Sequence, residues 1–369
     1  MAARGAAGVV STTAAQLARL VESAQSALAR SESHTRTFTV GGTTIRLVSA
    51  GPTLMRCFET AFTHLPSVDD DAPADLTVLM WDTESSGEPL PDLGGLLERA
   101  VDGTAPVLHD DECSFVYHAY ERAVTYLDAG RGLAVYAAAD AAVLPPWDRP
   151  APLRTLLTWW FARHGLLLAH GAAVGTDDGA VFITGAGGSG KSTTALACLA
   201  DGLGYLGDDY VLLDPERQMV WSVYGSAKLV PDHLARFPGL MTPEPTRAID
   251  PPDTKRVGWP AVERPDSMLL SAPIRALVCP TVTRGPVCRL VPTPMSRSFM
   301  AIAPFTMFQI PGDRKVAFDL SLRIVRGLHA YRLELGDGMD RVPGMIRDLI
   351  AGRIAEPDTR GSGVGGTTQ

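Results

Sequence analysis

A phosphate-binding loop is the clearest chemical signal in the sequence. Its glycines allow positive φ angles and let backbone N–H groups approach phosphate oxygens. The lysine is expected to reach the β- and γ-phosphates of ATP, and the serine hydroxyl to ligate Mg²⁺. Eight consecutive residues match the pattern G-x-x-x-x-G-K-[ST]: Gly185, Ala186, Gly187, Gly188, Ser189, Gly190, Lys191 and Ser192. Together with Thr193, which follows, they are predicted to bind ATP and Mg²⁺.

The elements on either side of this loop support that interpretation. Val181–Thr184 is a short apolar run that fits a buried strand, and the helix formers Ala195–Ala200 follow the loop. The phosphates would then lie at a helix N-terminus, where unpaired N–H groups and the helix dipole favour anions. A glycine-rich turn that matches the pattern by chance is the alternative, and it would not require this strand and helix.

Two adjacent acids follow the short predicted helix. Asp208 and Asp209 lie 17 and 18 residues beyond Lys191. If Leu203–Leu206 is a strand beside Val181–Thr184, both carboxylates lie near the nucleotide phosphates. One could hold Mg²⁺ and the other accept the proton of an attacking hydroxyl. We assign Asp209, with Ser192, to the metal, while the division of roles between the two acids stays open.

The position of these acids bears on the reaction class. Transport and motor ATPases usually place the acid that organises magnesium several elements later, so the early Asp208-Asp209 pair favours a kinase. The alternative is a solvated Asp-Asp turn at a strand end, which is common where no phosphate loop is near.

A histidine precedes the loop. Leu166–Val174 and the loop strand are separated by the turn Gly175–Gly179, which predicts a β-hairpin that leads into the phosphate loop. His170 lies in the first strand of this hairpin. A single histidine in a strand is more often a hydrogen-bonded core residue, but here it could instead face the transferred phosphoryl group or orient an aspartate.

Three zones of different composition organise the chain. Residues 1–150 are predicted to form a mixed α/β domain that ends in the Pro-rich stretch Leu144–Pro150. Its predicted helices are Thr12–Arg30, Leu54–His64 and Leu93–Val101, and Gly41-Gly42 predicts a hairpin. Residues 151–355 are predicted to be the nucleotide-binding domain. Residues 356–369 are rich in Gly, Ser and Thr and are expected to be disordered.

Further predictions concern strands and late helices. The expected strands of the first domain are Thr37–Val40, Thr44–Val48, Leu76–Trp81, Ser114–Tyr117, Ala123–Leu127 and Leu133–Tyr136. In the second domain we expect strands at Ala276–Cys279, Arg289–Val291 and Tyr331–Leu335, and helices at Leu320–His329 and Val342–Ile350.

Composition narrows the classes of partner. The net charge of −8 and the lack of a long basic stretch argue against a nucleic-acid binder and against charge-held attachment to anionic membranes. The most apolar stretch, residues 156–173, is interrupted by Arg163, His164 and His170, so we expect no membrane span. The five scattered cysteines suit a reducing compartment, and we expect a cytoplasmic protein.

Taken together, the His170 hairpin, the phosphate loop, the short helix and the Gly-Asp-Asp sequence resemble the catalytic domain of HPr serine kinase/phosphorylase. That family belongs to the phosphoenolpyruvate carboxykinase-like nucleotide-binding folds. The resemblance covers about residues 170–213 strongly, and continues more weakly to about residue 354. It implies an α/β fold with a P-loop kinase domain and a β-hairpin before the loop. It also implies catalytic roles for His170, Lys191, Asp208 and Asp209.

One segment departs from the family. HPr kinases carry a Glu-Ile-Arg-Gly type signature after the aspartates, whereas this chain has Tyr224-Gly225-Ser226-Ala227-Lys228-Leu229. The chain therefore looks more like divergent kinases of this fold, some of which phosphorylate ribosomally made peptides. Lys228, Lys255 and Arg256 are candidates for phosphate or substrate contacts, but we interpret each as a solvated cation.

The sequence predicts an ATP- and Mg²⁺-dependent kinase that acts on a hydroxyl of a peptide, a protein or a small molecule. One alternative is a nucleotide-dependent ATPase or switch. The other is a protein that binds nucleotide without phosphoryl transfer. The first domain is a candidate for substrate selection. The acceptor, phosphorolysis and the oligomeric state stay open, although relatives of HPr kinase form rings.

Overall fold

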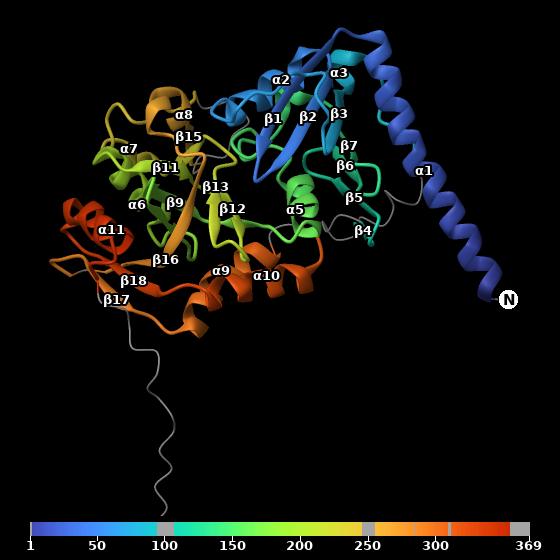
Figure 1. Ribbon diagram of the computed structural model, residues 1–369. Helices are drawn as coiled ribbons and strands as arrows, with labels where there is room; N and C mark the ends of the chain where they lie inside the picture. The colour runs from blue at the N-terminus through green and yellow to red at the C-terminus, as the bar shows by residue number, and fades with distance from the viewer. Residues whose placement is uncertain (1, 94–106, 246–254, 284, 309–310, 355–369) are drawn as a thin grey trace, which may run out of the picture.

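The chain folds around two β-sheets joined by a short linker and a helix (Figure 1). The computed structural model describes residues 2–93, 107–245, 255–283, 285–308 and 311–354. Helices cover both sheets, so the protein is of the mixed α/β class. The helix predicted at residues 93–101, apart from its first residue, and the tail at residues 356–369 lie outside the described residues.

The first sheet has seven strands in the order β1-β2-β3-β7-β6-β5-β4. The β1–β2 hairpin turns at Gly41 and Gly42, both with positive φ, as the Gly-Gly pair predicted. The other strand runs predicted in this zone also lie in this sheet. The strands are β1 (Ser33–Val40), β2 (Thr43–Ala50), β3 (Leu76–Asp82), β4 (Val107–His109), β5 (Cys113–His118), β6 (Ala123–Asp128) and β7 (Leu133–Ala138).

Helices cover both faces of this sheet because its strands alternate two sets of apolar side chains. The long helix α1 (Ala2–Arg30) packs Leu20 and Ala24 against one face, which includes Trp81. Helix α2 (Pro52–Phe58) and the 3₁₀ turn η1 (Glu59–Phe62) cover the other face. Short turns α3 (Thr83–Ser86) and η2 (Ala141–Val143) follow β3 and β7.

The second sheet carries the predicted phosphate loop. Seven of its strands follow the order β11-β9-β10-β16-β13-β12-β8, while β18 pairs with β16 and β17 pairs with β18. The long strand β16 lies parallel to β10 and β18 and antiparallel to β13. The strands are β8 (Leu167–His170), β9 (Ala172–Thr176), β10 (Gly179–Ile183), β11 (Gly204–Gly207), β12 (Tyr210–Asp214), β13 (Met219–Trp221), β16 (Ser271–Val282), β17 (Arg289–Pro292) and β18 (Ala330–Leu335).

Two pairs of helices cover this sheet on opposite faces (Figure 1). Helices α6 (Lys191–Ala200) and α11 (Val342–Ile350) share one hydrophobic cluster with β9, β10, β16 and β18. Helices α9 (Met295–Phe308) and α10 (Arg314–Arg326) contribute Ile302, Leu320 and Ile324 to a cluster on the other side. The predicted late strands and helices are present at these places, but α9 was not predicted.

A small antiparallel ribbon lies beside the second sheet. It consists of β14 (Ala227–Leu229) and β15 (Arg256–Gly258). The short helix α7 (Pro231–Leu234) follows β14, and α8 (Pro260–Glu263) with η3 (Pro265–Ser267) follows β15. The last 3₁₀ turn, η4 (Met339–Arg341), precedes α11.

One predicted strand pairing and the extent of one predicted strand were wrong. Leu203–Leu206 was expected beside Val181–Thr184, but β11 pairs with β9, and β10 lies between β9 and β16. The run Leu166–Val174 was expected to be one strand, but it breaks at Gly171 into β8 and β9. Glycine is needed at the break, since a Cβ on Gly171 would lie 2.6 Å from the carbonyl oxygen of Ile183.

The two sheets share one hydrophobic cluster, which includes Phe62, Tyr224 and residues of helix α5 (Arg154–Arg163). The contacts concentrate on the segment before β14. The Gly225 N–H donates to the Ala61 carbonyl at 2.8 Å, and His64 Nε2 lies 2.7 Å from Ser222 Oγ. The 3₁₀ turn η1 and His64, which follows it, therefore pack directly on residues 222–225, just before the strand that carries Lys228.

The linker between the sheets is held by buried polar groups. Arg154 Nη1 lies 3.2 Å from Asp148 Oδ1 and also donates to the Trp147 carbonyl. The Tyr224 hydroxyl donates to the Pro152 carbonyl at 2.9 Å. Burial raises the pKa of Asp148 to about 6, even though Arg154 opposes the shift. The cost of burying this carboxylate therefore exceeds the stabilisation by its partner.

We expect Asp148→Asn to flatten the pH dependence of stability. Because the native-state pKa of Asp148 lies above its unfolded value, the native protein binds the extra proton. This group therefore contributes stability below about pH 4 that is lost as the pH rises through about 6, worth at most ~3 kcal/mol. Urea unfolding from pH 4 to 7.5 measures it. An identical pH dependence in wild type and variant would contradict the expectation.

Candidate active site

The glycine loop joins β10 to α6. Gly185, Gly188 and Gly190 have φ angles of 147°, 77° and 106°, which L-residues with a side chain rarely adopt. Residues 186–188 are exposed, so the outer surface of the loop is accessible. A Cβ on Gly190 would lie 2.4 Å from Leu335 Cδ1, so the Leu335 side chain would have to shift. Helix α6 begins at Lys191 and directs its first N–H groups toward the loop.

Lys191 lies inside this loop rather than in solvent. Its side-chain ammonium donates to the Gly185 carbonyl at 2.8 Å and to the Ala186 carbonyl at 3.2 Å. Burial lowers the pKa of Lys191, which shows that its charge is poorly hydrated. Thr193, one turn into α6, lies 3.3 Å from His233 Nδ1 of α7.

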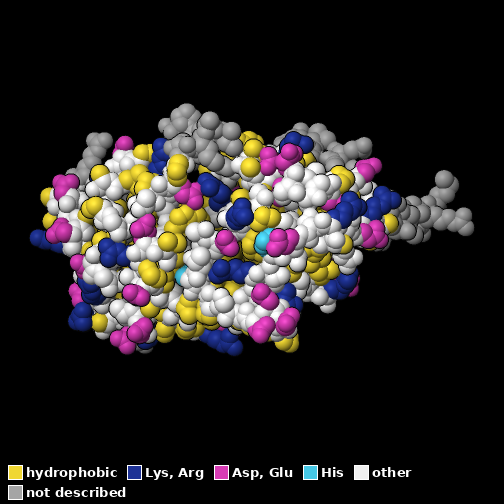
Figure 2. Space-filling model, turned by 90° about the horizontal axis from the view of Figure 1, so that it is seen from above, with side chains coloured by type: hydrophobic (Ala, Val, Ile, Leu, Met, Phe, Trp, Pro, Cys, Tyr) yellow, Lys and Arg dark blue, Asp and Glu magenta, His cyan; other side chains and the backbone are white. Residues whose placement is uncertain are grey.

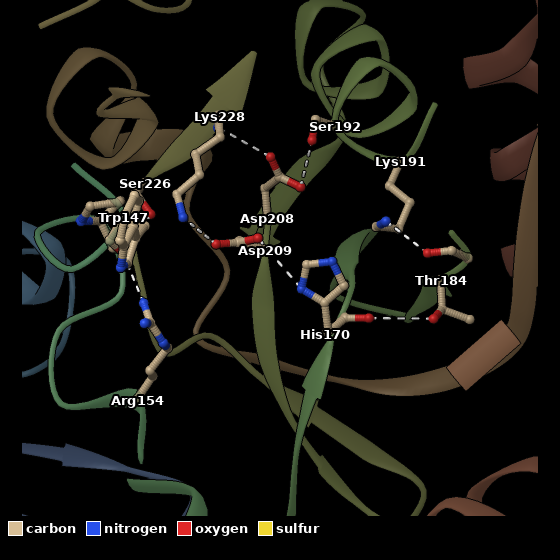
Figure 3. Close-up of polar contacts among 12 residues, drawn as sticks. Trp147, Arg154, His170, Thr184, Lys191, Ser192, Asp208, Asp209, Ser226 and Lys228 are labelled. Carbon is tan, nitrogen blue, oxygen red and sulfur yellow. Dashed lines mark hydrogen bonds and ion pairs between the residues drawn. The ribbon is translucent and has the colours of Figure 1, made fainter. Parts of the chain in front are cut away.

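Asp208 and Asp209 point in different directions (Figure 3). The turn between β11 and β12 places Asp209 at φ 78°, so the two side chains leave the backbone on different sides. Asp208 accepts a hydrogen bond from the Ser192 hydroxyl at 3.0 Å and one from the Lys228 backbone N–H at 3.2 Å. Asp209 instead lies 2.5 Å from Lys228 Nζ and 3.5 Å from His170 Nδ1.

The two carboxylates differ in their electrostatics. Asp208 is 1% exposed, and burial together with the neighbouring Asp209 charge raises its pKa, although the Ser192 hydrogen bond opposes this. Burial also disfavours the charged form of Asp209, but Lys228 and His170 outweigh burial and hold its pKa well below the usual range. Asp209 is therefore the carboxylate that stays ionised, and Asp208 is the one whose charge is least compensated.

His170 ends β8, directly opposite Tyr210 of β12. Its ring makes an edge contact with the Tyr210 ring at 5.3 Å. Burial lowers the pKa of His170 to about 4, against the opposing effect of Asp209. The imidazole is therefore neutral at neutral pH, and its contact with Asp209 is a neutral polar contact rather than an ion pair.

Lys228 is not a solvated cation, so that interpretation was wrong. Its side chain is 13% exposed and forms an ion pair with Asp209. The surrounding chain explains the burial, because β14 pairs with β15 and packs near α6. A signal existed in the sequence, since Lys228 lies within the segment that departs from the resembled family. Its partner Asp209, 19 residues away, was not predictable from spacing.

Two cavities border the glycine loop. One of about 310 Å³ lies over the start of α6 and is lined by Lys191, Ser192, Lys228 and Lys255, with His233 and Arg236 from the α7 region. The other, of about 800 Å³, is lined by residues 185–189, the end of β16 and the start of α9, including Arg297 and Met300. Seen from above, charged side chains of both signs are interspersed over the visible surface of the molecule (Figure 2).

The predicted site residues thus fall into two groups. Lys191, Ser192, Asp208, Asp209 and His170 lie close together around the start of α6. Ala186–Ser189 line the larger cavity on the outer side of the loop, while Thr193 faces α7. Ser192, paired with Asp209 in the sequence analysis, is adjacent to Asp208 instead. Within the described ranges, no cluster of three or more His, Cys, Asp or Glu side chains forms a metal site.

Comparisons with known proteins give little guidance. No protein-family model matches the chain, and no curated protein matches it. Among solved structures, the Hpr(Ser) kinase/phosphatase from Coxiella burnetii is similar at 14% sequence identity, over 50% of this chain and 93% of that chain, with a TM-score of 0.24. Similarity at that level does not establish a shared fold, so the function has to be inferred from the site itself.

No helix in the described part of the chain combines the length and the apolar character needed to cross a bilayer.

We expect Gly190→Ala to disrupt the loop and Gly187→Ala to leave it intact. The first substitution places a methyl group against Leu335 at a φ of 106°, at a cost of about 1–3 kcal/mol of stability or a displaced loop. At Gly187 no atom lies within 4 Å of the added Cβ. Thermal unfolding and calorimetric ATP titration of both variants measure this. Equal ATP affinity in the two variants would contradict the expectation.

Proposed function

We propose that the protein is a phosphotransferase that transfers the γ-phosphoryl group of ATP to a hydroxyl of a peptide, a protein or a small molecule. The observation that carries this proposal is the divergent Asp208-Asp209 pair next to the glycine loop. Asp208 is bonded to the first turn of α6, and Asp209 faces Lys228 and His170. One carboxylate is therefore suited to the phosphate side of a reaction and the other to the acceptor side.

ATP binding is proposed at the loop and the N-terminus of α6. The free N–H groups of the first helical turn attract anions, and the loop glycines permit close approach of the backbone. Lys191 would exchange its bonds to the Gly185 and Ala186 carbonyls for phosphate oxygens without leaving the loop.

The residues present fit Mg²⁺. Asp208 is buried, its pKa is raised, and its carboxylate is bonded by the Ser192 hydroxyl but by no side-chain cation that the structure describes. Magnesium commonly uses one or two carboxylates together with substrate phosphates and waters, so Ser192 and Asp208 would hold it. When bound, it supplies positive charge to the β- and γ-phosphate oxygens.

Asp209 is proposed to position the acceptor hydroxyl and to receive its proton. Its low pKa keeps it ionised as an acceptor of a hydrogen bond from the incoming O–H. Phosphoryl transfer has a largely dissociative transition state, so orientation of the hydroxyl matters more than basicity. His170, neutral at neutral pH, would orient the Asp209 carboxylate through its Nδ1 contact.

Two other functions remain as alternatives to be tested. A nucleotide-dependent ATPase or switch would release phosphate to water, and a binding protein would hold ATP without turnover. Asp209 lies in a partly covered position with its own cation and histidine, which favours transfer to an oriented hydroxyl over hydrolysis by free water.

The decisive experiment uses γ-labelled ATP with Mg²⁺ and a panel of serine- and threonine-containing peptides, proteins and polyols. We expect label on an acceptor in excess of free phosphate. Phosphate release without transfer to any acceptor would favour the ATPase, and binding without turnover would favour the binding protein.

Substitution of the two aspartates is expected to affect different properties of the reaction. Asp209→Asn should lower the transfer rate about 10²- to 10⁴-fold while ATP affinity changes little, because it removes the proton acceptor. Asp208→Asn should instead raise the Mg²⁺ concentration needed for half-maximal rate, because it removes a proposed metal ligand. Rates at varied Mg²⁺ separate the two. Unchanged rates in both variants would contradict the proposed mechanism.

A further inference from the structure

Lysine is scarce in this chain and concentrated at one place. The protein has 33 lysine and arginine residues, of which only four are lysine: Lys191, Lys228, Lys255 and Lys315. The first three line the cavity of about 310 Å³ over the start of α6. Lys315 lies on α10, exposed at a different place in the fold. A chain that uses arginine almost everywhere therefore has three of its four lysines at one cavity, which Arg236 also lines.

The geometry of the β14–β15 ribbon places two of these lysines on one face. Lys228 is opposite Val257 in the antiparallel register. Side chains two residues apart in an extended chain point to the same side, so Lys255 lies on the face of Val257 and Lys228. Arg256 belongs to the other face. Ala227 and Leu229 on the other face are buried in the hydrophobic cluster that includes α6, whereas Lys228 and the exposed Lys255 border the cavity.

The three ammonium groups differ in what they contact. Lys191 is bonded to loop carbonyls and Lys228 to Asp209. Lys255 forms no ion pair with a residue that the structure describes. After burial, which dominates, its charge is one of those that lower the pKa of Lys191 and of His170. Its charge therefore acts on the same small volume, which Lys255 lines together with Lys191 and Lys228.

We propose that Lys255 is a further catalytic residue, which binds the γ-phosphoryl group of ATP from the ribbon side, across the cavity from Lys191. This rests on the proposed binding of ATP at the glycine loop. Lysine suits the position because its compact charge on a flexible stem can follow a phosphoryl group as it moves between oxygens, whereas the planar guanidinium of arginine favours a fixed fork geometry. ADP lacks the group that Lys255 contacts.

Paired titrations with ATP and ADP in Mg²⁺ test this contact by calorimetry. Lys255→Met should weaken ATP binding about tenfold and change ADP binding less than about twofold, as expected for loss of one charge-assisted contact. Lys191→Met should weaken both nucleotides. Lys315→Met, which removes the one lysine remote from the cavity, is the matched control and should leave both affinities unchanged. Lys255→Gln repeats the test with a polar replacement.

Either of two results would overturn the proposal. One is an unchanged ATP affinity in the Lys255 variants, and the other is an equal loss of affinity for both nucleotides. The proposed transfer reaction is tested independently of this contact. If the wild type transfers no label but the ATP-specific loss is seen, Lys255 still contacts the γ-phosphate and only the reaction assigned to the site is wrong.

Discussion

Two adjacent carboxylates, one buried and one partly buried, are the constraint around which the site is arranged. Like charges on neighbouring residues raise one another's pKa, and burial adds to the penalty. The backbone relieves it by turning at Asp209 with φ 78°, which separates the two side chains. Asp208 then accepts a hydrogen bond from the Ser192 hydroxyl, and Asp209 forms an ion pair with Lys228. The helix that follows the loop and the β14–β15 ribbon are thus held together by one pair of acids.

This constraint ties the first sheet to the site. Lys228 follows the buried segment Ser222–Ser226, whose neighbours come from several places in the chain. His64 contacts Ser222, Ala61 accepts the Gly225 N–H, and the Tyr224 and Ser226 hydroxyls donate to linker carbonyls. Since the position of Lys228 sets the state of Asp209, the N-terminal sheet supports the ion pair through packing, in addition to any part in substrate selection.

Local signals in the sequence predicted most strands and helices, because turn glycines, β-branched runs and helix formers act over a few residues. The Gly41-Gly42 hairpin and the late strands and helices are examples. The pairing of segments far apart in the sequence was harder to predict. The position of β11 beside β9 depends on sheet order, and the role of Lys228 depends on a ribbon whose second strand lies 29 residues away. The separate directions of Asp208 and Asp209 follow from one positive φ, which is uncommon for residues other than glycine and which the sequence alone does not indicate.

The electrostatics also limit how the proposed reaction can work. A carboxylate with a strongly lowered pKa is a weak base, so Asp209 cannot drive the reaction by removing the proton early. A largely dissociative transfer does not require that, because the bond from phosphorus to the ADP oxygen is largely broken before the acceptor oxygen is bound, so the hydroxyl loses its proton late. The site then depends on fixed charge and orientation: the Lys228 ion pair keeps Asp209 ionised, and the neutral His170 ring fixes its direction. Such an arrangement selects for an acceptor whose hydroxyl is held by other contacts, since the base alone would not activate a freely diffusing water.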